Sequence, residues 1–380
     1  MTQRYRHLGP FSDLVAAAAR AHELFPQDLA PAEIRRRVRA LLAFGEDAPA
    51  PLDVRGGRRW QADGVVGEEV GWSVGYGPRT AAWVLRPAGL TGPLPGILAL
   101  HDHGGFKRCG KEKIADGPEP PAAEIVALRE RAYGGRAFAN ALARAGFVVL
   151  VHDVFLWGSR GLPADTLPET ERRLAPALAP LTGKPGTSAA SALYNAGAAL
   201  QEHLIAKYCT LLGTSIAALI CHEDRIAAAH LRSRGDVASA RIGCIGLSGG
   251  GCRAALLLAC DDAVAAAVIA CMMSTFAELL DRHVAPHSWM VFPPGLARIA
   301  DWPELAACRA PMPLMVQYAL ADELFTVDGM RAADARIGAA YQRAGAGGNY
   351  RGEFHPGPHR FDRAMQAAAF GWLRDRLEVS

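Results

Sequence analysis

At residues 241–258 the chain reads RIGCIGLSGGGCRAALLL. A short apolar run leads into small residues around Ser248, and an Ala/Leu-rich segment follows. This order predicts a buried strand, a tight turn and a helix. Gly246 and Gly250 flank the serine in the spacing G-x-S-x-G, which is the pattern of a nucleophile elbow.

The chemistry of an elbow explains this spacing. The serine must adopt a strained backbone conformation, and side chains at Gly246 and Gly250 would collide with the neighbouring strand and helix. The helix that follows directs its unpaired N–H groups at the reacting centre, where an oxyanion develops. We therefore expect the Gly249 N–H to be an oxyanion donor. The alternative is an ordinary glycine-rich turn, since the chain contains 40 glycines.

Two further residues can complete a catalytic set with Ser248. A serine hydroxyl is a weak nucleophile and needs a histidine base that is itself held by a carboxylate. Asp322 follows a predicted strand at 313–318, and His359 lies between the last predicted strand and the last predicted helix. The chain order Ser, Asp, His is that of an α/β-hydrolase layout, and it predicts Ser248, Asp322 and His359 as the triad.

Neighbouring residues compete for two of these roles. Glu323 and Asp328 are alternative acids, and His355 is an alternative base. Asp322 is preferred because it comes first after its strand, and His359 because it opens the step into the terminal helix. Surface turn residues are the alternative interpretation of both.

The loop after a predicted strand at 96–100 reads HDHGG at residues 101–105. Its glycines allow the backbone to approach a substrate oxygen closely, so we expect the His103 N–H to be the second oxyanion donor. His101 and His103 could instead bind a metal, but no third ligand of suitable spacing accompanies them. We predict no metal and no cofactor.

Two loops at the same sheet edge carry aromatic residues. Trp157 follows a predicted strand at 147–151, and Trp289 lies in an irregular region after a predicted strand at 264–271. An apolar side chain in a loop needs a reason, and contact with substrate is one. We predict both as substrate-binding residues, with a core-covering role as the alternative.

Composition restricts the class of protein. The chain has 380 residues, of which 50% are hydrophobic and 21% charged, with a net charge of +3. That charge is too small to indicate a nucleic-acid surface. Eight cysteines form no C-x-x-C pair, and no apolar run approaches the roughly 18 residues of a membrane span. With no apolar signal segment at the N-terminus, we predict a cytoplasmic protein without membrane or nucleic-acid partners.

The chain divides into two parts by pattern. We expect a helical appendage and linker at 1–60 and a catalytic domain at 61–380, with a helical insertion at about 160–210. The expected helices are Leu14–Leu24 (capped by Ser12-Asp13), Ala32–Phe44 (begun by Pro31), Ala122–Ala145, one or two over 189–232, Gly329–Arg343 and Phe361–Leu377. The expected strands are Val70–Tyr76, Thr80–Pro87, Gly96–Leu100, Phe147–Val151, Arg241–Gly246, Val264–Cys271, Pro313–Tyr318 and Tyr350–His355. Their alternation predicts an α/β fold with a doubly wound, mostly parallel sheet flanked by helices.

The ordered motifs resemble the α/β-hydrolase superfamily, in particular its dienelactone-hydrolase and acetyl-xylan-esterase-like branch, from about Gly64 onward. The matching pieces are residues 100–105 with 110–113, Asp153 with 157–160, 212–214 with 224–225, 241–250, 321–325 and 357–361. This branch commonly has His-Gly-His-Gly-Gly where the present loop has Asp102 in place of the first glycine. A carboxylate there could bind a polar substituent of the substrate.

The resemblance and the triad together imply a serine esterase acting on a small or medium carboxylic ester, such as an acetyl ester. Two rival hypotheses stay open. The same triad could cleave an amide, a lactone or a carbon–carbon bond, or the chain could be a hydrolase-fold protein that binds a ligand without turnover. The expected partner is a small-molecule ester, and a homo-oligomer is possible.

Overall fold

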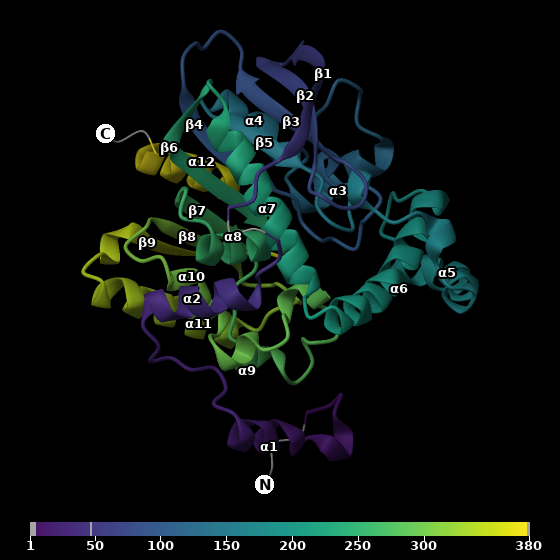
Figure 1. Ribbon diagram of the computed structural model, residues 1–380, viewed down its shortest axis with the longest axis vertical. Coiled ribbons are helices and arrows are strands. Elements are labelled where there is room, and N and C mark those ends of the chain that lie inside the picture. Colours follow the sequence, from purple (N-terminus) through teal and green to yellow (C-terminus); the bar gives the residue numbers. More distant parts are fainter. Residues whose placement is uncertain (1–4, 46–47, 378–380) are drawn as a thin grey trace.

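The computed structural model describes residues 5–45 and 48–377. Within these residues nine strands form one mixed sheet in the order β1-β2-β3-β5-β4-β6-β7-β8-β9 (Figure 1). The first three strands and β5 pair antiparallel, whereas β5, β4, β6, β7, β8 and β9 are parallel. The predicted doubly wound, mostly parallel α/β architecture is therefore confirmed.

The strands are β1 (Leu52–Ala62), β2 (Val65–Ser73), β3 (Thr80–Pro87), β4 (Leu94–Leu100), β5 (Val148–His152), β6 (Val237–Leu247), β7 (Val264–Ala270), β8 (Leu314–Ala319) and β9 (Tyr350–His355). The helices are α1 (Leu14–Ala21), α2 (Pro31–Leu41), α3 (Ala123–Ala132), α4 (Phe138–Arg144), α5 (Glu169–Thr182), α6 (Ala189–Leu211), α7 (Ile216–Ser233), α8 (Gly249–Cys260), α9 (Phe276–Leu279), α10 (Trp302–Ala307), α11 (Val327–Arg343) and α12 (Arg363–Leu377). All eight predicted strands are present, with ends shifted by a few residues.

Three local predictions are wrong. The helix expected over 122–145 is divided into α3 and α4, because Gly134 and Gly135 both have positive φ and end the first helix. Ser12 does not cap α1, since its hydroxyl accepts from the Tyr5 N–H at 2.9 Å and donates to the Gly9 carbonyl at 2.8 Å. The expected linker contains β1, and residues 46–47 of it lie outside the described part.

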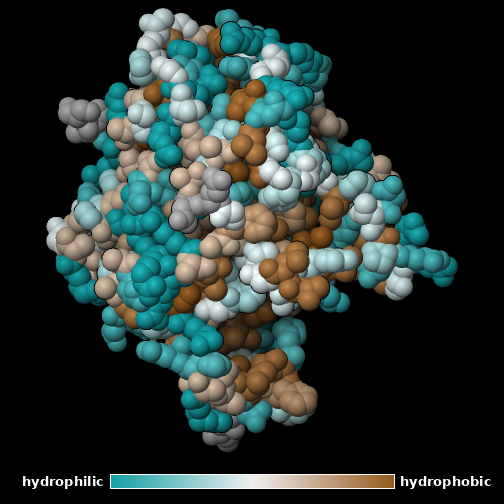
Figure 2. Space-filling view, in the orientation of Figure 1, coloured by the Kyte–Doolittle hydropathy of each residue, from teal (hydrophilic) through white to brown (hydrophobic). Residues whose placement is uncertain are grey.

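The two N-terminal helices differ in burial. Ile34 and Val38 of α2 are buried in the main hydrophobic core, so α2 is part of the packed body. No residue of α1 is buried, and this helix protrudes at the bottom of Figure 1. Figure 2 shows hydrophobic surface there. Phe11 and Leu14 are 71% and 57% exposed, respectively. Because β1 also crosses residue 60, the predicted domain boundary does not separate an appendage from the sheet.

The core lies on both faces of the sheet. One cluster packs β strands against α2, α7, α8, α10 and α11, and the other packs them against α3, α4 and α12. Helices α5 and α6 lie in the predicted insertion and project sideways from this body (Figure 1). We call them the arm. Among the described helices none alone is long and apolar enough to cross a membrane, although α6 and α7, bent by 88° at their junction, reach that length jointly.

Candidate active site

Ser248 occupies the turn between β6 and α8. Its backbone has φ 56° and ψ −119°, which a residue with a side chain rarely adopts. The Ser248 N–H donates to the Ala270 carbonyl at 2.8 Å, which ties the turn to the end of β7. The predicted strained conformation is present, and it lifts the serine off the end of the strand.

The glycines around Ser248 are required by space. A Cβ on Gly246 would lie 2.7 Å from the Gly250 Cα, and a Cβ on Gly250 would lie 2.9 Å from the carbonyl carbon of Leu100. Both distances are shorter than real Cβ contacts, and the obstacle in each case is backbone. The elbow therefore depends on glycine at both positions, as the spacing predicts.

The two expected oxyanion donors lie next to each other. A Cβ on Gly249 would be 2.6 Å from the His103 amide nitrogen, so the loop after β4 passes directly over the start of α8. Gly249 is the first residue of α8, where N–H groups have no partner within the helix. The His103 N–H has no acceptor among the described residues. Both amides are free for a substrate oxygen.

His359 and Asp322 form a close pair. His359 Nδ1 lies 2.5 Å from Asp322 Oδ2, and the other carboxylate oxygen accepts from the Leu324 N–H at 2.9 Å. The Asp322 side chain is fully buried, whereas the imidazole is 24% exposed. Because Nδ1 is engaged, Nε2 is the ring nitrogen left to exchange a proton with a ligand.

One cavity of about 590 Å³ collects these groups. Ser248, His359, Asp322 and the loop residues His103–Gly105 all line it. Its remaining walls come from the turns after β7 and β8, from α3, and from the segment that joins the arm's two helices. The cavity thus opens at the carboxyl ends of the parallel strands, where an open α/β sheet places its ligands.

The competing residues are placed differently. His355 lies on β9 and pairs with Glu353, with 3.2 Å between His355 Nε2 and Glu353 Oε2. Asp328 is exposed near the start of α11, and Glu323 lines the cavity but is exposed and does not contact His359. The preference for Asp322 and His359 agrees with this geometry.

Asp102 lines the cavity, but its carboxylate is bonded to other side chains of the protein. Its carboxylate accepts a hydrogen bond from the Tyr133 hydroxyl and lies 3.6 Å from Lys113 Nζ. The residue is 4% exposed. This carboxylate ties the loop after β4 to Tyr133, which directly follows α3, and its predicted contact with a polar part of the substrate stays a prediction.

The two tryptophans predicted to bind substrate do not line the cavity. Trp157 is 1% exposed and packs beneath the loop after β4, where its indole N–H donates to the His103 carbonyl at 3.4 Å. Trp289 begins a short 3-10 helix at Trp289–Val291 and is 43% exposed, with its indole N–H donating to His203 Nδ1 at 3.0 Å. The core-covering alternative is correct for Trp157, and Trp289 lies on the outer side of the cavity wall.

The structure also adds residues to the site. Cys271, at the end of β7 with φ 47°, has its sulfur within 4.8 Å of ligand atoms of Asp322 and His359. Burial and the Asp322 carboxylate raise the pKa of this thiol, which donates to the Arg360 carbonyl at 3.2 Å. His287 lines the cavity, and burial lowers its pKa. An apolar strand end and a loop histidine carry no sequence signal that separates them from similar residues elsewhere.

A buried ionic cluster supports the elbow from below. Arg253, on α8, pairs with Asp224 of α7 through Nε at 3.0 Å and Nη2 at 2.6 Å. Arg253 Nη1 also donates to the His101 carbonyl at 3.2 Å. Burial, together with Arg253 and Lys113, lowers the pKa of His101 well below its usual value, which keeps its imidazole neutral. His101 is thus part of the scaffold, while only His103 reaches the cavity.

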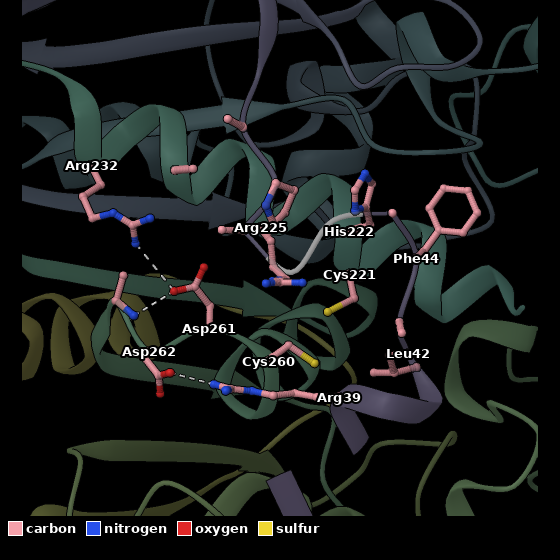
Figure 3. A pocket seen from close by; sticks show the side chains of 17 residues that line it. Arg39, Leu42, Phe44, Cys221, His222, Arg225, Arg232, Cys260, Asp261 and Asp262 are labelled. Carbon is pink, nitrogen blue, oxygen red and sulfur yellow. Dashed lines mark hydrogen bonds and ion pairs between the residues drawn. The ribbon is translucent and has the colours of Figure 1, made fainter. Parts of the chain in front are cut away.

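A second cavity, of about 620 Å³, lies away from Ser248 between the end of α2, α7 and the end of α8 (Figure 3). Asp262 and Asp261 at its rim pair with Arg39 and Arg232, respectively (Figure 3). Its described lining contains no hydroxyl nucleophile. The second cavity therefore offers no alternative to Ser248 as a hydroxyl nucleophile among its described lining residues.

Comparison with known proteins agrees with the architecture. No family model matches the chain. It is 24% identical over 274 residues to YtaP of Bacillus subtilis (strain 168), a protein assigned as a hydrolase, covering 72% of this chain and 75% of YtaP.

Solved structures resemble the chain over most of its length. A protein assigned as an acetyl xylan esterase from Bacteroides fragilis NCTC 9343 superposes with a TM-score of 0.62 at 17% identity, covering 92% of this chain and 83% of that one. A glucuronoyl esterase from Solibacter usitatus gives 0.61 at 16% identity, covering 90% and 91%. Acetyl xylan esterase 1 from Thermoanaerobacterium sp. JW/SL YS485 gives 0.57 at 13% identity, covering 94% and 98%. The sheet order, the elbow and these likenesses together establish that the chain has the fold of the α/β-hydrolase superfamily.

Proposed function

We propose that this protein is a serine hydrolase of carboxylic esters. The observation that carries the proposal is one cavity lined by an elbow serine, by a histidine that a buried carboxylate holds at 2.5 Å, and by two adjacent free amides. Each group has the chemical character that its role in acyl transfer requires. The esterase names of the structural neighbours support the same reaction class.

The reaction uses groups of this chain alone. The Ser248 oxygen attacks the ester carbonyl carbon while His359 Nε2 takes its proton, and Asp322 stabilises the imidazolium. The N–H groups of Gly249 and His103 hold the oxyanion of the tetrahedral intermediate. The alcohol leaves with the proton from His359, and water then attacks the acyl-enzyme with the same histidine as base.

We propose the substrate only as a chemical class. Two neighbours are named for acetyl xylan and a third for glucuronoyl esters, so an ester of a carbohydrate is the first class to test. The cavity volume of about 590 Å³ lies within the usual range of small-molecule sites, which gives room for a small acyl group with a sugar-sized alcohol. Water, rather than a cofactor, is the only other reactant needed; this and the cytoplasmic location stay predictions.

The direct test is hydrolysis of p-nitrophenyl acetate and acetylated xylo-oligosaccharides by the wild type and by Ser248→Ala. We expect turnover by the wild type and loss of essentially all of it in the variant. Turnover retained by Ser248→Ala would reject the proposal. If neither protein turns over any ester in a panel and no acyl-enzyme forms, amide, lactone or carbon–carbon bond cleavage or ligand binding takes its place.

A further inference from the structure

A buried carboxylate that the reaction scheme does not use lies beside the oxyanion loop. Glu202, on α6 of the arm, is 5% exposed and does not line the cavity. A buried charge is costly unless it is paired and hydrogen-bonded. The contacts that compensate the buried charge of Glu202 join three segments that are far apart in the sequence.

One carboxylate oxygen holds the loop after β4. Glu202 Oε2 lies 3.2 Å from His103 Nε2 and forms an ion pair with Lys107 Nζ. His103 Nδ1 accepts from the Gly105 N–H at 3.1 Å, so the ring proton is on Nε2 and is donated to Glu202. The side chain of His103 is thus hydrogen-bonded to Glu202, and the backbone N–H of the same residue is the proposed oxyanion donor.

The other oxygen holds the cavity wall. Glu202 Oε1 accepts from the Ser288 hydroxyl at 2.5 Å and from the Trp289 N–H at 3.2 Å. Ser288 lines the cavity, and the 3-10 helix that it caps through Met290 N continues that wall. One side chain therefore connects the loop after β4 to the wall that begins at Ser288.

Other contacts also hold the loop after β4. Asn195, seven residues earlier on α6, accepts from the Lys107 N–H at 2.8 Å. Lys107 Nζ lies 4.8 Å from the centre of the Trp157 ring, and Trp157 donates to the His103 carbonyl. Burial opposes the charge of Glu202, but His103 and Lys107 outweigh it and hold the pKa of the carboxyl well below its usual value.

We propose that Glu202 is a positioning residue: it fixes the loop that carries the His103 N–H against the wall that begins at Ser288. The inference rests on the proposed function, since it assigns Glu202 a part in holding the oxyanion hole. The arm is thereby more than an insertion, because it supplies the group that sets the position of one oxyanion donor. Glu202 does not line the cavity, so it acts through the loop and the wall and not directly on Ser248 or the substrate.

The test compares Glu202→Gln with Glu304→Gln. Gln keeps the size of the side chain but cannot pair with Lys107, and Glu304 is a matched, mostly buried carboxylate whose partner, Arg336, lies outside the cavity lining. Active sites are counted with a fluorophosphonate, so that rates refer to competent enzyme. We expect kcat of Glu202→Gln to fall about 10- to 100-fold with KM changed less than about threefold, since an oxyanion donor displaced by a fraction of an ångström loses most of its effect.

Two further readouts separate positioning from mere folding. A boronic acid that forms a tetrahedral adduct with the serine should bind Glu202→Gln more weakly by the same factor as kcat/KM falls. Removing the stranded cation in Glu202→Gln/Lys107→Met should restore part of the rate, because replacing both members of a buried pair costs less than breaking it. Amide hydrogen exchange at residues 103–107 should be faster in Glu202→Gln, and this holds whether or not the protein is an esterase.

Opposite results overturn the inference. Equal kcat per labelled site in Glu202→Gln and Glu304→Gln, or unchanged exchange at residues 103–107, would show that Glu202 does not position the loop. If Glu202→Gln does not fold, Glu202→Gln/Lys107→Met takes its place in the test. A folded double variant that recovers no rate would also reject the inference. Retained turnover in Ser248→Ala would instead reject the proposed function, and the exchange measurement would then decide on the Glu202 contacts alone.

Discussion

The elbow and the arm hold their parts of the site in different ways. At the elbow, backbone and glycines within five residues fix Ser248, and the neighbouring carbonyls leave no room for side chains. The arm acts through one long side chain, and Glu202 reaches partners 99 and 86 positions away in the sequence. The turn that holds Ser248 is thus built locally, whereas the loop after β4 is bonded to a side chain that is distant in the sequence.

The largest expected effect sharpens the choice of base. His359→Ala should lower kcat on the order of 10⁵- to 10⁶-fold, because a serine without its base loses nearly the whole triad effect. His355→Ala is the matched control, since that histidine is bound to Glu353 on β9, and it should keep the rate within a few-fold. Steady-state kinetics on p-nitrophenyl acetate decides between them, and a comparable loss in both variants would undo the assignment.

Asp322→Asn should cost about 10⁴-fold in kcat, because an amide favours the wrong tautomer of His359. The control is Glu323→Gln, whose carboxylate is exposed and outside the His359 pair. We expect this control to stay within about threefold. A stopped assay with burst titration measures both, and a larger loss in Glu323→Gln would transfer the role of acid to that residue.

Gly246→Ala breaks the local part of the comparison. The added methyl meets Gly250 backbone, so the turn must open, and we expect a loss of about 1–3 kcal/mol in stability together with about 100-fold in kcat. Gly235→Ala is the control, because nothing lies within 4 Å of a Cβ there. Urea unfolding and kinetics measured side by side would contradict the account if Gly246→Ala matched the control.

The two tryptophans test the corrected wall of the cavity. Trp157→Ala should lower stability by about 3–5 kcal/mol, since the ring is fully buried beneath the loop after β4. Trp289→Ala should leave stability within about 1 kcal/mol and KM within about twofold, because its ring lies outside the cavity lining. A large KM increase in Trp289→Ala would return that residue to the substrate site.

The pH dependence of stability sharpens the other half of the comparison. Because the folded-state pKa of Glu202 lies below its unfolded value, its stabilisation is complete above about pH 5 and is lost as pH falls. Wild type should exceed Glu202→Gln in stability by about 2 kcal/mol at pH 7, and the gap should shrink below about pH 4. Thermal unfolding from pH 3 to pH 8 measures it, and a constant gap would contradict a charged Glu202.

Local pattern predicted most of the fold, and it also selected the residues that we propose to react. Strands appear as apolar runs, and Ser248, Asp322 and His359 each come after a strand. A parallel sheet therefore places them at one edge, where they line the same cavity. The roles of Asp102, Trp157 and Trp289 depend on which neighbour each side chain meets, and no spacing encodes that. Glu202 could not be found from the sequence, because a glutamate in an Ala-rich helix is usually exposed to solvent and its partners here are distant in the sequence.

The central claim is that Ser248 becomes acylated during turnover. Rapid quenching of the protein with p-nitrophenyl acetate, followed by peptide mass spectrometry, tests it most directly. We predict an acetyl group on the peptide that contains Ser248 and none on that peptide from Ser248→Ala. Turnover of the ester with acetyl only on other residues, or with none on the peptide at 241–253, would contradict the account.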